Sequence, residues 1–178
     1  MIKTEKQQIF HAKMLSDIRD ILEKNNITAI LTGSALLGAR REGDLLAHCP
    51  GVVLSTFYDQ IKPKENSVIS DLKNAGFKIE KHFINRNYKI RVSKKGLNAE
   101  ICGYSEAKKY YYRKIQNKTK IIPKKLLSPP WGSIELRGKL YKTPHNIEKY
   151  LRYTYKNWKV KMTGTPSSYK TNKHMRIK

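Results

Sequence analysis

The spacing of apolar residues predicts two amphipathic helices in the first half of the chain. Between positions 14 and 22 the apolar residues fall at helical spacing with acidic side chains among them, which predicts a helix over 5–24. A second helix is expected over 65–75, because the apolar periodicity there ends at Gly76 and glycine commonly follows a helix C-terminus.

Between these helices the pattern predicts a strand, a tight turn and a further helix. The apolar run 28–32 has strand character, Gly33 and Ser34 form a turn, and 35–41 is rich in helix-forming residues. The run 52–54 is then expected to form a buried strand.

Alternating apolar and polar residues predict a three-stranded meander after the second helix. Its strands are expected over 77–83, 88–92 and 97–101, with polar or glycine-containing turns at 85–87 and 94–96.

The last third predicts a small hairpin and a short helix. The strands 133–136 and 140–142 flank Arg137 and Gly138, and a helix is expected to start near Pro144 and to run through Tyr155. We expect one α+β domain over 1–162, with a small mixed sheet packed against helices, followed by a flexible basic tail over 163–178.

Composition limits the location and the partners. The chain has two cysteines and no apolar run long enough to span a membrane, and 1–13 is too polar for a signal peptide. We therefore expect a cytoplasmic protein, either free or held peripherally at the inner face of a membrane. The formal net charge of +23 would attract nucleic acid, anionic lipid, nucleotides or acidic glycans, and charge alone does not choose among them.

Two segments resemble the LicD family, which includes phosphocholine transferases of bacterial surface glycans and the eukaryotic fukutin-related proteins. The stretch 27–44 (ITAILTGSALLGARREGD) is similar to the family's opening motif, and 117–160 is similar to its closing pattern. The closing matches are Ile122-Pro123, Pro130-Trp131-Gly132, Gly138, Thr143-Pro144-His145-Asn146, Glu148, Tyr150-Leu151, Tyr155 and Trp158.

The resemblance implies a nucleotidyltransferase-type fold. It also implies transfer of a phosphocholine or phospho-sugar group from a CDP-linked donor to lipopolysaccharide, capsule or teichoic acid. The donor phosphates would bind at Gly33 and Ser34, where helix N–H groups favour anions, with Arg40 and Arg41 nearby.

The chain departs from the family where metal ligands are expected. The family has alternating Asp residues, whereas this chain reads Cys49-Pro50-Gly51-Val52-Val53. Two-metal phosphoryl transfer needs oxygen ligands for Mg²⁺ or another divalent metal, and Gly and Val supply none. The resemblance implies that Glu100 corresponds to a third family carboxylate, on a later strand, and Asp44 is a second candidate for catalysis.

A rebuilt metal site is one alternative. His48, Cys49 and Cys102 could join Glu100 around a softer ion, because imidazole and thiolate suit Zn²⁺. The simpler interpretation is that both cysteines act as small buried hydrophobes and that Asp44 belongs to a turn.

The sequence leaves open whether the chain is an enzyme. The favoured hypothesis is a LicD-like protein of surface glycan decoration with impaired catalysis, which needs no metal if it is inactive. The alternative is a non-catalytic basic module that binds nucleic acid or another polyanion. The aromatic and basic run 110–114 has the composition for such binding, but a structural strand or a glycan-facing role is the favoured interpretation of that run.

Overall fold

The computed structural model describes residues 3–49, 51–83, 88–115, 118–155 and 157–160. The helices are α1 (Glu5–Lys24), α2 (Gly33–Glu42), α3 (Tyr58–Ile61), α4 (Glu65–Asn74) and α5 (Ile147–Thr154), with 3-10 turns at Lys62–Lys64 and Lys124–Leu126. The strands are β1 (Ile30–Leu31), β2 (Gly51–Phe57), β3 (Lys78–Phe83), β4 (Lys89–Lys94), β5 (Leu97–Glu106), β6 (Tyr110–Ile115), β7 (Lys118–Pro123), β8 (Gly132–Leu136) and β9 (Lys139–Thr143).

The local predictions are largely confirmed. Helix α1 has the expected bounds and begins in a capping box, in which Thr4 and Gln7 each accept a hydrogen bond from the other's backbone N–H. The meander and the β8–β9 hairpin form as expected, while 110–114 belongs to strand β6. Pro50, the turn 85–87 and the tail 163–178 lie outside the described residues.

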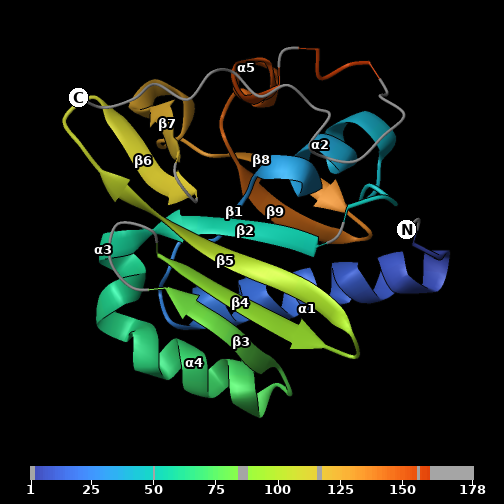
Figure 1. Ribbon diagram of the computed structural model, residues 1–178. Helices are drawn as coiled ribbons and strands as arrows, with labels where there is room; N and C mark the ends of the chain where they lie inside the picture. Colours follow the sequence, from blue (N-terminus) through green and yellow to red (C-terminus); the bar gives the residue numbers. More distant parts are fainter. Residues whose placement is uncertain (1–2, 50, 84–87, 116–117, 156, 161–178) are drawn as a thin grey trace.

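The sheet is mixed and has the order β3-β4-β5-β2-β1-β9-β8 (Figure 1). The pairs β2–β5 and β1–β9 are parallel, and the other pairs are antiparallel. Strand β5 runs beyond the main sheet and pairs through its last residues with β6, which pairs in turn with β7. The long β5 therefore connects the central sheet with the β6–β7 hairpin.

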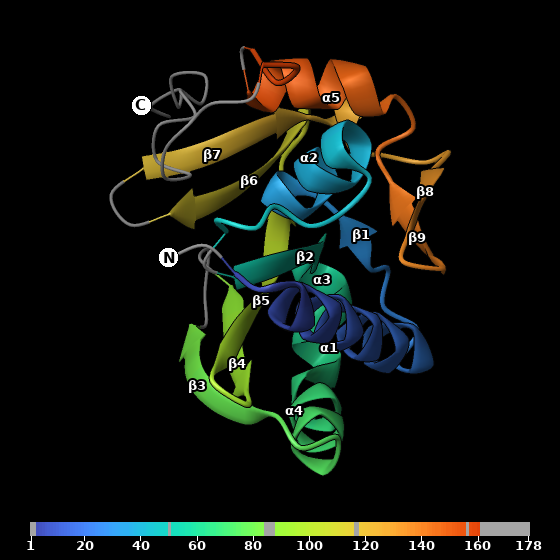
Figure 2. The ribbon, with the colours of Figure 1, turned by 90° about the vertical axis from the view of Figure 1, so that its right-hand side faces the viewer.

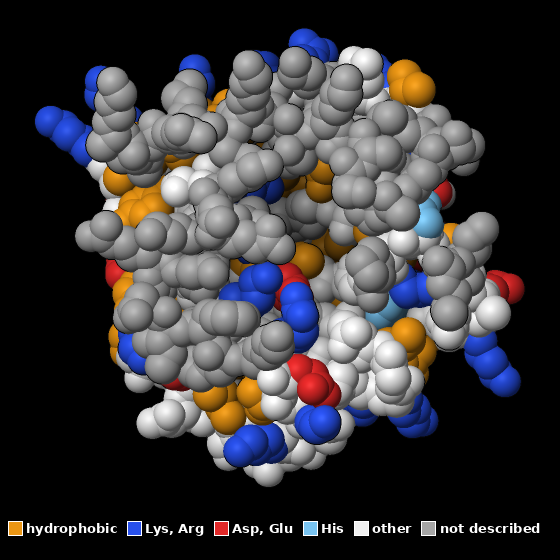
Figure 3. Space-filling view, viewed as in Figure 1, with side chains coloured by type: hydrophobic (Ala, Val, Ile, Leu, Met, Phe, Trp, Pro, Cys, Tyr) orange, Lys and Arg blue, Asp and Glu red, His pale blue; other side chains and the backbone are white. Residues whose placement is uncertain are grey.

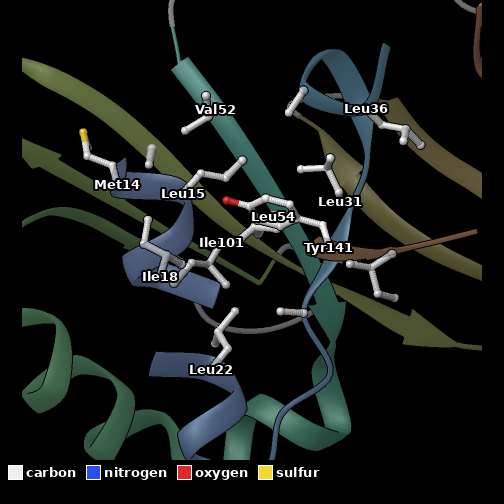
Figure 4. Close-up of a cluster of buried hydrophobic side chains, with 14 of the residues drawn as sticks. Met14, Leu15, Ile18, Leu22, Leu31, Leu36, Val52, Leu54, Ile101 and Tyr141 are labelled. Atoms are coloured by element: carbon white, nitrogen blue, oxygen red, sulfur yellow. The ribbon is translucent and has the colours of Figure 1, made fainter. Parts of the chain in front are cut away.

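The helices form two groups around the central strands. Helices α1 and α4 lie on one side, whereas α2, α5 and the β6–β7 hairpin lie on the other (Figure 2). The core between α1 and the sheet is apolar, and its side chains interdigitate as Figure 4 shows. Its members include Leu15, Ile18 and Leu22 of α1, Val52 and Leu54 of β2, and Ile101 of β5.

None of the described helices has the length and apolar character that crossing a bilayer requires. The single-domain prediction and the assignment of the tail stay predictions.

Candidate functional site

The N-terminus of α2 forms the turn that the sequence predicts. Gly33 has a φ of +63°, a left-handed conformation that glycine adopts without steric cost. The Thr32 hydroxyl does not cap the helix, because it is hydrogen-bonded to Ser55 Oγ of β2 at 2.6 Å. Thr32 thus leaves the first-turn N–H groups uncapped, which is the state in which a helix N-terminus can bind an anion.

The sheet face opposite α1 carries polar side chains. Because successive side chains in a strand alternate, residues flanking Val52, Leu54 and Ile101 point away from the α1 core. The cross-strand neighbours on this face are Val53, Glu100 and Arg91 in one row, and Ser55, Cys102 and Lys89 in the next. Basic side chains lie beside an acidic one near the middle of the molecule, over the central strands (Figure 3).

Glu100 is held by two cations of β4. Arg91 donates to Oε1 from Nε at 2.9 Å and from Nη2 at 2.6 Å, and Lys89 Nζ lies 3.1 Å from Oε2. Burial favours the neutral acid, but Arg91 and Lys89 outweigh it and lower the pKa of Glu100. Both carboxylate oxygens are therefore engaged with cations at neutral pH.

The described residues do not fit a divalent metal pair. Gly51 and Val53 stand where the resemblance implies acids, and Glu100 is shared by Lys89 and Arg91. Within the described part of the chain, no group of three His, Cys, Asp or Glu side chains could hold a metal ion. The structure thus gives no support to Mg²⁺ binding at this face.

The predicted soft-metal cluster of His48, Cys49, Cys102 and Glu100 is not formed. Gly51 pairs with Asn98, whereas Cys102 pairs with Ser55, four residues further along β2. At about 3.3 Å per residue, this puts Cys102 some 13 Å along the strand from Gly51, and Cys49 lies beyond Gly51 in the other direction. The two thiols therefore lie toward opposite ends of β2.

Asp44 is not brought to the Gly33 turn. It follows the C-terminus of α2, and a ten-residue helix spans about 15 Å. Asp44 Oδ1 accepts from Arg137 Nε at 2.8 Å and from its neighbour Leu45 N at 2.7 Å. Burial favours the neutral form, yet Arg137 and the Leu45 N–H lower the pKa of Asp44 overall. These contacts tie the α2–β2 loop to the β8–β9 turn.

Arg40 and Arg41 also lie at the wrong end of α2 for the predicted phosphate role. Arg40 Nη2 is 2.8 Å from Glu148 Oε1 on α5. Arg41 Nη2 is 2.7 Å from Glu42 Oε1, and its Nη1 donates to the carbonyls of Trp158 and Val160. Both side chains hold the C-terminal segment against α2 rather than extending toward Gly33.

A small cavity lies between α1, α2 and the start of β2. Its volume is about 10 Å³, enough for one water molecule, and its lining includes Lys3, His11, Ser34 and Cys49. The Ser34 hydroxyl is hydrogen-bonded to the Cys49 thiol, and burial raises the pKa of Cys49 despite this bond. Cys49 is thus a buried thiol, as the simpler interpretation of the sequence expects.

His11 is the buried polar group of this cavity. Its ring is hydrogen-bonded to the Asn98 backbone carbonyl, and Nε2 has no hydrogen-bond partner among the described residues. Burial and the nearby charge of Lys3 lower the pKa of His11 to about 4, so the imidazole is neutral at pH 7.

Sequence reasoning missed Lys89 and Arg91. The signal that could have found them is the turn at Lys95 and Gly96, which fixes the β4–β5 register and so sets Arg91 opposite Glu100.

Solved structures share this arrangement of elements at low sequence identity. The solution structure of ANT(2'')-Ia, an antibiotic-resistance factor, matches 77% of this chain with a TM-score of 0.51 and 9% identity. This chain spans 66% of the length of that protein, slightly under two thirds. A crystal structure of ANT(2'')-Ia in complex with adenylyl-2''-tobramycin covers 74% of this chain and 67% of that one, at 9% identity and a TM-score of 0.47.

A Thermotoga maritima protein assigned as a nucleotidyltransferase covers more of both chains. The match extends over 82% of this chain and 84% of that one, with a TM-score of 0.50 and 14% identity. No protein-family model matches the sequence, and no curated protein shows significant similarity to it.

The chain therefore has the nucleotidyltransferase fold, as the sequence predicted. Identity this low establishes the fold alone, and the function has to be argued from the side chains of the site.

Proposed function

We propose that the protein is a LicD-like member of this fold that binds the phosphates of a cytidine-linked donor directly through its own cations. The donor in this proposal is CDP-choline or a CDP-linked sugar, and the acceptor is an anionic surface glycan. The observation that carries the proposal is the pairing of Glu100 with both Lys89 and Arg91 on the face that adjoins the α2 N-terminus.

Electrostatics favour an anionic ligand on this face. Two cations face one carboxylate, so the cluster keeps one net positive charge, and the N-terminus of α2 adds about half a unit of charge. Thr32, the residue before Gly33, is hydrogen-bonded to Ser55, and Ser55 lies one row from Glu100 on the same face. A diphosphate could thus contact the helix N-terminus and the basic cluster together.

The same residues argue for slow transfer chemistry. Gly51 and Val53 supply no metal ligand, and Lys89 and Arg91 compete with any cation for Glu100. Loss of metal ligands removes stabilisation of the negative charge in the transition state of phosphoryl transfer. Each loss of about 1.36 kcal/mol of transition-state stabilisation slows the reaction tenfold. Donor binding without efficient turnover is the expected behaviour.

Calorimetric titration with CTP and CDP-choline tests the proposal, with and without Mg²⁺ and at two salt concentrations. We expect binding that does not need Mg²⁺ and that persists, more weakly, at the higher salt. Binding that requires Mg²⁺ would contradict direct recognition by cations. Equal competition by a single-stranded oligonucleotide at physiological salt would favour the nucleic-acid module instead.

Glu100→Gln is expected to tighten CTP binding about threefold to tenfold, because Lys89 and Arg91 then lose their carboxylate partner. The measurement is the dissociation constant in Mg²⁺-free buffer.

Glu80→Gln is the matched control, since Glu80 is an exposed residue of β3 paired with Lys78, and its replacement changes the net charge equally. A Glu100→Gln protein that binds more weakly than wild type, while Glu80→Gln does not, would identify Glu100 as a contact of the nucleotide itself and overturn the proposal.

A further inference from the structure

Two cations face each other on the β6–β7 hairpin. The register pairs Arg113 of β6 with Lys120 of β7, so their side chains lie on the same face of the hairpin. Like charges directly opposite each other across two strands are destabilising. The direct pairing of Arg113 with Lys120 is therefore unfavourable unless another group offsets the two positive charges.

The side chains around the pair are buried and come from two further elements, β5 and α5. The Arg113 guanidinium carbon is 5.5 Å from the ring centre of Tyr104, and Cys102 of β5 and Tyr150 of α5 also interact with Arg113. The Tyr104 hydroxyl is hydrogen-bonded to the Lys120 ammonium. Cys102 and Tyr150 are fully buried and Tyr104 is 1% exposed, so the two cations pack against buried side chains.

Helix α5 is fixed against this hairpin. Tyr153 donates a hydrogen bond from its hydroxyl to the Ile121 carbonyl of β7 at 3.0 Å. Helix α5, which carries Tyr150, is therefore held to β7, the strand that carries Lys120.

No acidic side chain in the described residues neutralises either cation. From position 107 onward the sequence has only Glu135 and Glu148 as acids, and Glu148 is paired with Arg40. Glu106, at the end of β5, is paired with Lys124. Arg113 Nε is buried and has no hydrogen-bond partner among the described residues. Partly buried cations without an anionic partner are costly, and together with the unpaired Nε–H of Arg113 this indicates that an external anion completes the cluster.

The pKa values of Arg113 and Lys120 shift in opposite directions. Burial and the charge of Arg113 lower the pKa of Lys120 against the opposing effect of Tyr104. Burial opposes the charge of Arg113 as well, but its contacts with Cys102, Tyr104 and Tyr150 keep the pKa of Arg113 above its ordinary value.

We propose that Arg113 and Lys120 form a binding site for the phosphate group of a small phosphate ester or diphosphate. The planar guanidinium offers several donors to phosphate oxygens, and the ammonium adds a second charge. The free Arg113 Nε–H and the Lys120 ammonium would donate to the phosphate.

The site continues the basic face of the central sheet. Cys102, which interacts with Arg113, pairs with Ser55, and Ser55 is hydrogen-bonded to Thr32 at the start of α2. A phosphate at this site would therefore lie on the same side of the sheet as the α2 N-terminus. The inference does not depend on the proposed function, because it requires no cytidine nucleotide.

Lys120→Met tests the site by two measurements, thermal unfolding and calorimetric titration with pyrophosphate. In phosphate-free buffer the variant is expected to unfold about 3 °C above wild type, because it removes one of two facing cations. Pyrophosphate at constant ionic strength is expected to stabilise wild type, and its affinity is expected to fall at least about tenfold in the variant.

Lys125→Met is the matched control, because Lys125 is an exposed lysine of the turn after β7 and its loss changes the net charge equally. We expect it to keep wild-type pyrophosphate affinity. Arg113→Lys is a second variant, which retains the charge but removes the guanidinium fork, and it is expected to weaken pyrophosphate binding as well.

Two results would overturn the proposal. One is a wild-type protein that pyrophosphate neither binds nor stabilises. The other is a Lys120→Met protein that is less stable than wild type in phosphate-free buffer and binds pyrophosphate as wild type does, which would assign Lys120 a structural contact with Tyr104. Binding of pyrophosphate without binding of CTP would leave this site standing while the proposed cytidine donor fails.

Discussion

Gly38→Ala is expected to lower the free energy of unfolding by about 3 kcal/mol. A Cβ atom on Gly38 would lie 2.5 Å from the Asp44 backbone oxygen and 2.9 Å from the Leu46 backbone nitrogen. Both neighbours are main-chain atoms of the loop that returns from α2 to β2, so neither can rotate away. The clash outweighs the gain of about 1 kcal/mol that alanine brings to a helix interior.

Urea unfolding followed by circular dichroism at pH 7 measures this effect, with Gly43→Ala as the control. Gly43 follows the same helix with a φ of +70°, and a Cβ there meets no atom within 4 Å. Only the backbone strain of about 1 kcal/mol is then expected. A Gly38→Ala protein as stable as wild type would show that the loop packs less closely against α2 than these distances require.

Local structure followed from the sequence because its causes are local. The apolar stripe of α1, the Gly33 turn and the β8–β9 hairpin each have a periodicity or a turn residue that predicts them. The pairing of Glu100 with Arg91 was also within reach, because a two-residue turn at Lys95 and Gly96 fixes the register on both sides.

The errors at the candidate site came from treating closeness in sequence as closeness in space. Arg40 and Asp44 follow Gly33 within eleven positions. Helix α2 starts at Gly33, however, so both residues lie toward its C-terminal end, with Arg40 about 10 Å from Gly33 along the helix axis. Their partners, Glu148 and Arg137, lie about a hundred residues away along the chain. Sequence patterns give no signal for contacts of that range.

The Arg113 site also depends on a contact between segments that are distant along the chain. The residues 110–114 have an aromatic and basic composition that suits nucleic-acid binding, although the sequence favours a structural strand or a glycan-facing role for them. The chemistry of this site depends on the register that puts Lys120 opposite Arg113 and on the packing of α5 against the hairpin. The position of α5 has no local sequence cause, because Tyr153 meets Ile121 across 32 residues of the chain.

Acidification from pH 7 to pH 4 is expected to reduce the unfolding free energy by about 3 kcal/mol through His11 alone. The pKa of His11 is about 4 in the folded protein, and that of an unfolded histidine is about 6.5. Between these values the unfolded chain binds the proton and the folded protein does not, so stability falls as the pH falls from 6.5 to 4. Below pH 4 both states are protonated, and this group contributes no further loss.

Urea unfolding of wild type and His11→Asn at pH 7, 5.5 and 4.5 isolates this contribution. Asparagine keeps a donor for the Asn98 carbonyl but cannot be protonated, so the variant should lose less stability than wild type over this interval. His145→Asn is the control, because His145 is exposed before α5 and its replacement should leave the wild-type slope intact. Equal slopes for wild type and His11→Asn would mean that the cavity admits water and that the imidazole ionises within the folded protein at an ordinary pH.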